Sequence, residues 1–341
     1  MKKALAGLCV IFCGSLLPMA CDRFAPSTSV PSVGSFSVIA SPTRTFSNTP
    51  TATKTPFDTP TPVSTLICAF LPVTQWGGLG VGGGSFNGPL DAAADAVTNI
   101  YVLDSANRKI QVFDKNGIYL TEWTGGGSLW IPSNMVLNPV LSRIYVLDTT
   151  SVAPSTGVVR VFDTNGSQRP AWNVPINSFG LALDSQGRVY VGSSNTVIRY
   201  DQNGFNPVYY YSQGVTGQSF NGVQGVAADS QGNVFVANST TVQKFNASGQ
   251  YQFPWGSPGT GPSQFAGINY IRTDAGGNIF VVDNPIIGGV YYGRVQKFDT
   301  NGSLICYYLA ASVRYQGLAF DPAGELFVAD GLNNMMLKFI P

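Results

Sequence analysis

Few side chains in this chain are able to do acid–base or metal chemistry. Among the 341 residues there is no histidine, and glutamate occurs only at Glu122 and Glu325. The absence of imidazole excludes Ser-His-Asp and Cys-His catalysis and the commonest zinc sites. A reactive site would therefore have to work without imidazole.

Cysteine is rare and has no metal-thiolate spacing. Cys9 and Cys13 lie in an apolar N-terminal segment and Cys21 follows it, which leaves Cys68 and Cys306. In an exported protein two remaining thiols favour a disulfide. An alignment of the repeats described below, however, places both on equivalent outer strands of adjacent units, farther apart than the roughly 7 Å Cα limit for a bridge. The alignment therefore argues against a disulfide.

The chain from residue 66 onward repeats one unit six times. An aromatic residue in a short apolar run recurs at positions 101, 145, 190, 235, 280 and 327, at intervals of 44, 45, 45, 45 and 47 residues. Each unit contains an apolar run, an Asp-initiated tight turn such as Asp229–Gly232, the aromatic run, an alternating run such as Val242–Asn246 and an Asn-Gly-type turn such as Asn301–Gly302. Gly and Asn favour the positive φ of such turns. The pattern predicts four strands, a to d, per unit, and it predicts that most aspartates stabilise turns rather than bind calcium.

Four-stranded units of this length pack best around a common axis, as in β-propellers. Segments such as Gly225–Asn238 and Asp104–Asp114 resemble NHL repeats, although Arg108-Lys109 stands where that repeat more often has His-Arg. The resemblance covers residues 66–341 and implies an all-β, six-bladed propeller. The chain ends after a third strand, Met336–Phe339, and Leu66–Phe70 resembles a fourth strand. We therefore expect this N-terminal strand, Leu66–Phe70, to complete the sixth blade.

Four residues depart from the repeat where strand a approaches the axis. Three units have Gly four residues before the turn residue, whereas the others have Asp91, Asn134 and Tyr270. Arg272 stands where four other units have alanine, and a charge beside the channel needs a partner. Departures from a consistent pattern mark function or strain. These residues are candidates for a ligand site at the channel mouth, with compensated drift of the repeat as the alternative.

Two connections between strands b and c are long, at residues 149–157 and 284–293. They belong to diametrically opposed blades and are expected on the face that also carries the d-to-a connections, which we call the top face. Tyr291 and Tyr292 in the second connection offer broad contact area at low entropic cost and are further ligand-binding candidates. Ordinary loop variation is the alternative.

The N-terminal residues predict export. Lys2 and Lys3 precede an apolar stretch that is too short to span a bilayer comfortably. The following Leu17–Cys21 resembles a bacterial lipobox, with Pro18 as a departure, and this implies lipidation of Cys21; the alternative is an ordinary cleaved signal in which Cys21 is coincidental. Residues 1–20 are thus expected to be a signal peptide. Residues 21–65 are expected to be a disordered tether, because 25 of the 41 residues from Ala25 to Thr65 are Ser, Thr or Pro.

These features predict a membrane-anchored lipoprotein, periplasmic or on the cell surface. We expect a non-enzymatic binding or scaffold module whose partner is a protein, peptide or glycan on the top face, with no cofactor and no metal. The alternative is a metal-dependent propeller hydrolase or lyase with an axial site, for which Asp91 and Asn134 are the plausible ligands. The lyases of comparable fold use histidine. Nucleic-acid binding is disfavoured because residues 66–341 contain 14 basic and 16 acidic side chains.

Overall fold

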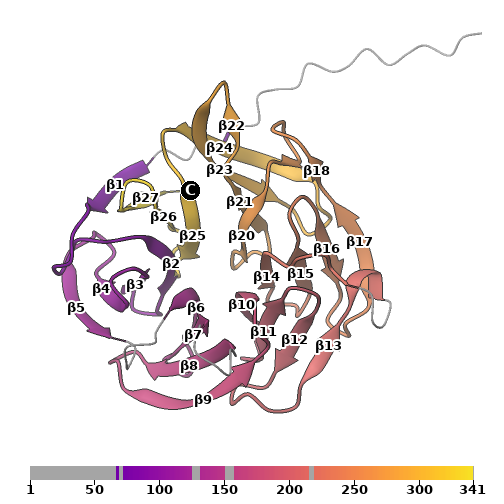
Figure 1. The fold of residues 1–341 in the computed structure, drawn as a ribbon, viewed down its shortest axis with the longest axis horizontal. Helices are drawn as coiled ribbons and strands as arrows, with labels where there is room; N and C mark the ends of the chain where they lie inside the picture. The colour runs from indigo at the N-terminus through magenta and orange to yellow at the C-terminus, as the bar shows by residue number, and fades with distance from the viewer. Residues whose placement is uncertain (1–66, 69–71, 125–130, 150–156, 215–218, 341) are drawn as a thin grey trace, which may run out of the picture. The chain divides into compact units, whose positions relative to one another are not determined.

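The computed structural model describes residues 67–68, 72–124, 131–149, 157–214 and 219–340. These residues form six antiparallel sheets, or blades, around a central axis (Figure 1). The predicted all-β, six-bladed propeller is confirmed. No helix among these residues is long and apolar enough to cross a membrane. The predicted signal peptide, Cys21 and the tether lie outside the described residues.

Each blade has its strands in the order a to d from the axis outward. Blade one contains β2 (Pro89–Ala94), β3 (Ile100–Asp104), β4 (Lys109–Phe113) and β5 (Tyr119–Thr124); blade two contains β6 (Pro132–Asn138), β7 (Arg143–Thr149), β8 (Gly157–Asp163) and β9 (Gln168–Val174); blade three contains β10 (Ser178–Leu183), β11 (Val189–Ser193), β12 (Val197–Tyr200) and β13 (Val208–Tyr210). Blade four contains β14 (Gly225–Ala228), β15 (Val234–Ala237), β16 (Val242–Phe245) and β17 (Tyr251–Trp255); blade five contains β20 (Ile268–Thr273), β21 (Ile279–Asp283), β23 (Val290–Phe298) and β24 (Leu304–Ala311), with β22 (Ile286–Ile287) added; blade six contains β25 (Tyr315–Phe320), β26 (Leu326–Asp330), β27 (Met335–Phe339) and β1 (Pro72–Gly77). Outside the blades, β18 (Ser257–Pro258) and β19 (Gln264–Phe265) pair in parallel, and η1 (Ser212–Gly214) is a short 3-10 turn.

The second strand of each blade lies in the core. All residues of β3, β11, β15, β21 and β26 are buried, because each sheet packs against a neighbour on both faces. This explains the unbroken apolar runs around the recurring aromatic residue. The outermost strands, such as β5, are largely exposed.

The aspartates at the a–b turns accept backbone hydrogen bonds within those turns, as the sequence predicts. Asp229 Oδ1 accepts hydrogen bonds from the backbone N–H groups of Gln231 and Asn233, at 3.0 and 2.8 Å. The same arrangement recurs at Asp95, Asp184 and Asp321. The turns between strands a and b are thus held by their own side chains.

Adjacent blades are also joined near their outer edge. The ring of Trp76, in strand d of blade six, lies over Gly117 in the c–d turn of blade one, and a Cβ at Gly117 would come within 2.6 Å of that ring. Four further pairs repeat this contact: Trp123 with Gly166, Trp172 with Gly204, Tyr210 with Gly249 and Trp255 with Gly302. Glycine in these turns therefore provides space for the aromatic ring of the preceding blade as well as positive φ.

An N-terminal strand completes blade six, as predicted. β1 pairs antiparallel with β27, from Pro72 opposite Phe339 to Gly77 opposite Met335. The clasp strand is Pro72–Gly77, however, and not Leu66–Phe70, whose first described residue, Ile67, forms a parallel bridge with Tyr307 of blade five. The prediction therefore gave the correct blade but the wrong strand, since Ile67 pairs with blade five and not with blade six.

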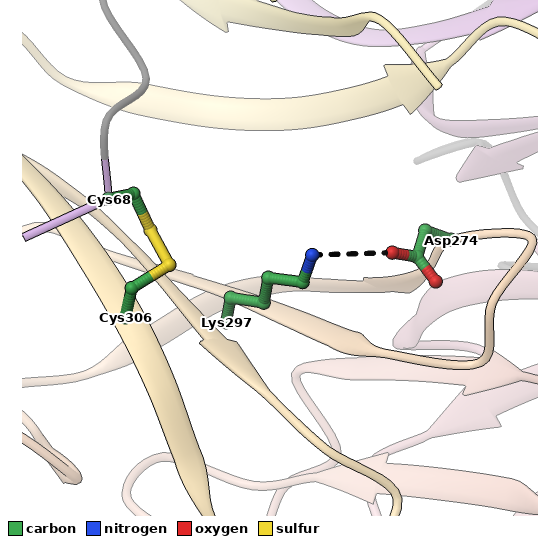
Figure 2. Close-up of a disulfide and its surroundings, with 4 residues drawn as sticks. All are labelled: Cys68, Asp274, Lys297 and Cys306. Carbon is green, nitrogen blue, oxygen red and sulfur yellow. Dashed lines mark ion pairs between the residues drawn. A yellow bond between two sulfur atoms is a disulfide. The ribbon is translucent and has the colours of Figure 1, made fainter. Parts of the chain in front are cut away.

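Cys68 and Cys306 form a disulfide, so the argument against a bridge was wrong. Their Cα atoms are 5.0 Å apart and the S–S distance is 2.06 Å (Figure 2). The alignment failed because Cys68 does not occupy the fourth-strand position of blade six. It lies beside β24 of blade five, where its backbone N–H donates to the carbonyl of Tyr307 at 2.9 Å. The bridge therefore ties the start of the propeller to blade five, next to the clasp.

Candidate functional site

Asp91 is fully buried in β2 rather than exposed at a channel mouth. Its Oδ1 accepts hydrogen bonds from the Tyr270 hydroxyl at 2.7 Å and from the N–H of Ala92 at 2.8 Å. Its Oδ2 accepts from the N–H of Met135 in blade two, also at 2.8 Å. Both carboxylate oxygens are thus engaged by the protein itself.

Tyr270 reaches Asp91 across blade six, because blade six has retained glycine. Tyr270 belongs to blade five and Asp91 to blade one, and Gly317 of β25 lies between them. A Cβ at Gly317 would come within 2.4 Å of Asp91 Oδ1. The hydrogen bond between Tyr270 and Asp91 therefore requires glycine at position 317, because a larger side chain there would collide with Asp91.

Arg272 extends across the channel. One of its terminal nitrogens, Nη2, donates to the carbonyl of Met135 in the opposite blade at 2.9 Å and to the Tyr270 hydroxyl. The same nitrogen lies 3.7 Å from Asp91 Oδ1. The expectation that this charge needs a partner is confirmed. Asp91, Tyr270 and Arg272, which we call the axial cluster, join blades one, two and five.

Burial dominates the electrostatics of the axial cluster. It raises the pKa of Asp91 to about 6, although the Arg272 charge and the hydrogen bonds from Met135 and Tyr270 act in the opposite direction. Burial also raises the pKa of Tyr270 well above its ordinary value. Tyr270 is therefore a neutral hydrogen-bond donor at neutral pH, and Asp91 is largely ionised opposite Arg272.

Asn134 does not join the axial cluster. Its side-chain oxygen accepts a hydrogen bond from the N–H of Gly180 in blade three at 2.9 Å. Asn134 thus links the inner strand of blade two to that of blade three, just as Asp91 links the inner strand of blade one to that of blade two. The structure thus brings three of the four inner candidates together and leaves Asn134 apart.

Tyr291 and Tyr292 lie on the third strand of blade five, away from the inner strands. Tyr291 pairs with Ile286 and Tyr292 with Ala311 of the outermost strand. Tyr291 is half exposed at the tip of a hairpin with Ile286, Ile287 and Val290. The long connection of blade two falls mostly within residues 150–156, outside the described residues, so only the long connection of blade five is described.

The two residues suggested for an axial metal are engaged in separate hydrogen bonds. Asp91 faces Arg272, whose positive charge disfavours a cation at the same place. Asn134 turns its oxygen toward Gly180. Within the described part of the chain, no group of three or more Cys, Asp or Glu residues is placed to hold a metal ion.

Open space lies at the opposite end of the channel from the b–c connections. A hollow of about 480 Å³ opens among the a–b turns of all six blades, with Arg272 at its base. Its wall includes Leu137, Pro139, Leu183 and Phe320. Sequence reasoning missed this face because each turn, taken alone, is explained by its own Asp cap. The only signal for it was the set of apolar residues beside those caps.

Comparison with known proteins supports the fold alone. No family model matches the chain, and no curated protein matches its sequence. Among solved structures, a streptogramin B lyase superposes with a TM-score of 0.52 at 10% identity, covering 78% of this chain and 96% of that one. The virginiamycin B lyase of Staphylococcus aureus gives 0.53 at 10% identity, over 75% and 95% of the two chains. The chain shares the six-bladed fold of these proteins.

A third neighbour carries no assigned activity. It is a structural genomics protein of unknown function from Bacteroides thetaiotaomicron, with a TM-score of 0.57, 14% identity and coverage of 79% of this chain and 75% of that one. At identities this low, a shared propeller fold is compatible with many functions.

Proposed function

We propose that this chain is an exported, lipid-anchored propeller of the NHL-repeat type that acts as a non-enzymatic binding or scaffold module for a protein, peptide or glycan. The observation that carries the proposal is the state of the axial cluster. Its acid, phenol and guanidinium groups bond to one another and to the backbone across the channel. The groups best suited to chemistry are therefore used to hold blades together, while hollows on the surface remain open for recognition.

The disulfide supports the export component of the proposal. Disulfides persist in oxidising compartments and are rare in the cytosol. Cys68 and Cys306 are 238 residues apart in sequence, and the bond joins an element just after the expected tether to blade five. A structural role of this kind fits a protein that folds outside the cytoplasm.

Two measurements on the purified chain test the binding function against the enzymatic alternative. We expect elemental analysis to find no divalent metal at stoichiometric amounts, and we expect binding to members of peptide or glycan arrays at micromolar or better affinity. A stoichiometric metal that is required for hydrolysis or elimination of an array member contradicts the proposal. So does the absence of binding to every protein, peptide and glycan tested.

The proposed lipid anchor is tested by the substitution Cys21→Ser. We expect the variant to lose lipidation and to move from the detergent phase to the aqueous phase in detergent partitioning, because a lipid chain contributes about 0.8 kcal/mol per buried CH₂ group. Cys9→Ser, within the expected signal peptide, is the matched control and should leave partitioning unchanged. Retention of the Cys21→Ser variant in the detergent phase contradicts lipid anchoring, and an unchanged melting temperature shows that the propeller itself is intact.

A further inference from the structure

The hollow at the channel end continues across the face of the a–b turns. A second hollow of about 330 Å³, between blades two and three, shares Leu137, Pro139, Leu183 and Ser185 with it. A third, of about 230 Å³ between blades five and six, shares Asp274, Ala275 and Phe320 with it. The three hollows form one trough, which we call the a–b groove, running from blades two and three across the axis to blades five and six.

The shape of the a–b groove suits an extended chain. It crosses the ring from blades two and three to blades five and six, so its length spans opposite blades. The residues at its two ends differ in exposure. Val140, at the end between blades two and three, is 87% exposed. Phe280, at the end between blades five and six, is buried beneath Lys297. A compact small molecule would occupy one hollow, but only a linear ligand occupies all three.

The a–b groove carries an excess of negative charge. Five aspartates line it, Asp95, Asp184, Asp229, Asp274 and Asp321, against two cations, Arg272 and Lys297. Asp184 is itself paired with Arg188 at 2.5 Å. Both cations have acidic partners, since Arg272 lies by Asp91 and Lys297 lies 3.8 Å from Asp274 (Figure 2). Asp95, Asp229 and Asp321 have no ion pair among the described residues, and of these Asp229 and Asp321 are buried beneath the groove surface. A ligand that supplies positive charge therefore complements this face.

The remaining lining favours a peptide over a glycan. The walls are aliphatic or proline at Leu137, Pro139, Leu183 and Pro322. The two phenylalanines of the lining, Phe280 and Phe320, pack against each other at a ring-centre distance of 4.6 Å. The aspartates already accept the N–H groups of their own turns, as at Asp229. Sugars need many polar contacts and flat aromatic faces, whereas an extended peptide places alternate side chains in apolar pockets.

We propose that the a–b groove binds an extended polypeptide segment in which lysine or arginine alternates with aliphatic residues. This inference deepens the proposed function and rests on it. It places the partner on the face opposite the top face, and it specifies the partner as basic and linear. The aliphatic side chains fill the hollows, and the cationic groups lie over the uncompensated carboxylates.

The probe is a blocked nonapeptide of alternating lysine and leucine, with a matched peptide in which glutamate replaces lysine, titrated into the full lipid-free chain by fluorescence anisotropy. We expect the lysine peptide to bind at least tenfold more tightly than the glutamate peptide, and its affinity to fall as salt rises because salt screens the attraction between the lysines and the groove carboxylates. The groove variant is Ala275→Arg, which adds bulk and positive charge at an exposed turn position in the middle of the path.

The matched control is Ala323→Arg, an exposed alanine in the equivalent turn of blade six that does not line the groove. We expect Ala275→Arg to weaken lysine-peptide binding at least tenfold and Ala323→Arg to leave it within twofold, with equal melting temperatures. Equal loss in both variants, or none in either, contradicts the groove as the site.

Other outcomes separate this inference from the function on which it rests. Binding of neutral glycans that is blocked by Ala275→Arg, with no binding of the lysine peptide, overturns the basic-peptide inference but leaves the binding function standing. Binding of the lysine peptide that is insensitive to Ala275→Arg but lost on Tyr291→Ala moves the site to the top face. A chain that binds no peptide, glycan or protein overturns both.

Discussion

Deleting residues 66–76 is expected to lower the melting temperature of the chain by about 10–20 °C and to make blade six the first site of proteolysis. The deletion removes the disulfide, which contributes about 2–4 kcal/mol, and the pairing of β1 with β27. It also removes Trp76, which packs against Phe113 and Phe327 at ring-centre distances of 5.8 and 6.1 Å. Loss of a packed tryptophan costs about 3–5 kcal/mol, and each kcal/mol shifts the melting temperature of a large domain by roughly 2–4 °C.

Two variants divide this effect into its parts. Cys68→Ser removes only the covalent link, and we expect it to lower the melting temperature by about 5–10 °C, a shift that a reducing agent reproduces in the unaltered chain. Deletion of residues 40–50, an equally long piece of the expected tether, should leave melting unchanged. Calorimetry measures the melting temperature of each variant, and limited proteolysis measures which blade is cleaved first. A chain lacking 66–76 that melts and resists protease like the full chain shows that β1 does not secure the ring.

The features that were predicted correctly depend on local pattern. The interval between aromatic residues set the number of blades, and the alternation of turns set the four strands of each blade. The closing strand followed from counting, because a sixth blade that ends at Phe339 lacks one strand. Each of these conclusions needed residues within one repeat unit and the general rule that sheet edges must be covered.

The features that were missed depend on which units meet in space. The repeat alignment argues against the disulfide because it assigns Cys68 to blade six by likeness, whereas the chain passes blade five before it reaches β1. Arg272 was singled out correctly as a departure from alanine, but its partner Met135 lies 137 residues away on the opposite blade. The a–b groove depends on turns from separate blades that together enclose a space, which no single turn encodes.

The substitution Arg272→Met is expected to lower the free energy of unfolding by about 3–5 kcal/mol at pH 7.5, because it leaves the Asp91 carboxylate buried without its cation. Methionine fills a similar volume, so the loss reflects charge rather than a cavity. The matched control is Arg169→Met, since Arg169 is 45% exposed and pairs with Asp163 at the surface. Such pairs contribute about 0–1 kcal/mol.

The pH dependence of this variant separates an electrostatic role from simple packing. The pKa of Asp91 in the folded chain is about 6, above its ordinary value of 3.8, so the folded state binds a proton more readily than the unfolded state. By linkage, the contribution of Asp91 to stability falls as pH rises from about 4 to 6, by roughly 3 kcal/mol in all. Removing Arg272 raises that pKa further, so the loss in Arg272→Met should shrink at pH 5, where Asp91 is protonated, and reach its full size above pH 7.

Chemical denaturation at pH 5 and 7.5, combined with titration of the lysine peptide, decides what the axial cluster does. We expect Arg272→Met to lose stability at pH 7.5, to recover at least half of it at pH 5, and to keep its peptide affinity within about threefold, because the terminal nitrogen of Arg272 is already bonded to Met135 and Tyr270. An equal loss at both pH values contradicts a charge-based role and leaves only packing. Unchanged stability with peptide binding abolished identifies Arg272 as a ligand contact, and the axial cluster is then a binding site rather than the device that holds three blades together.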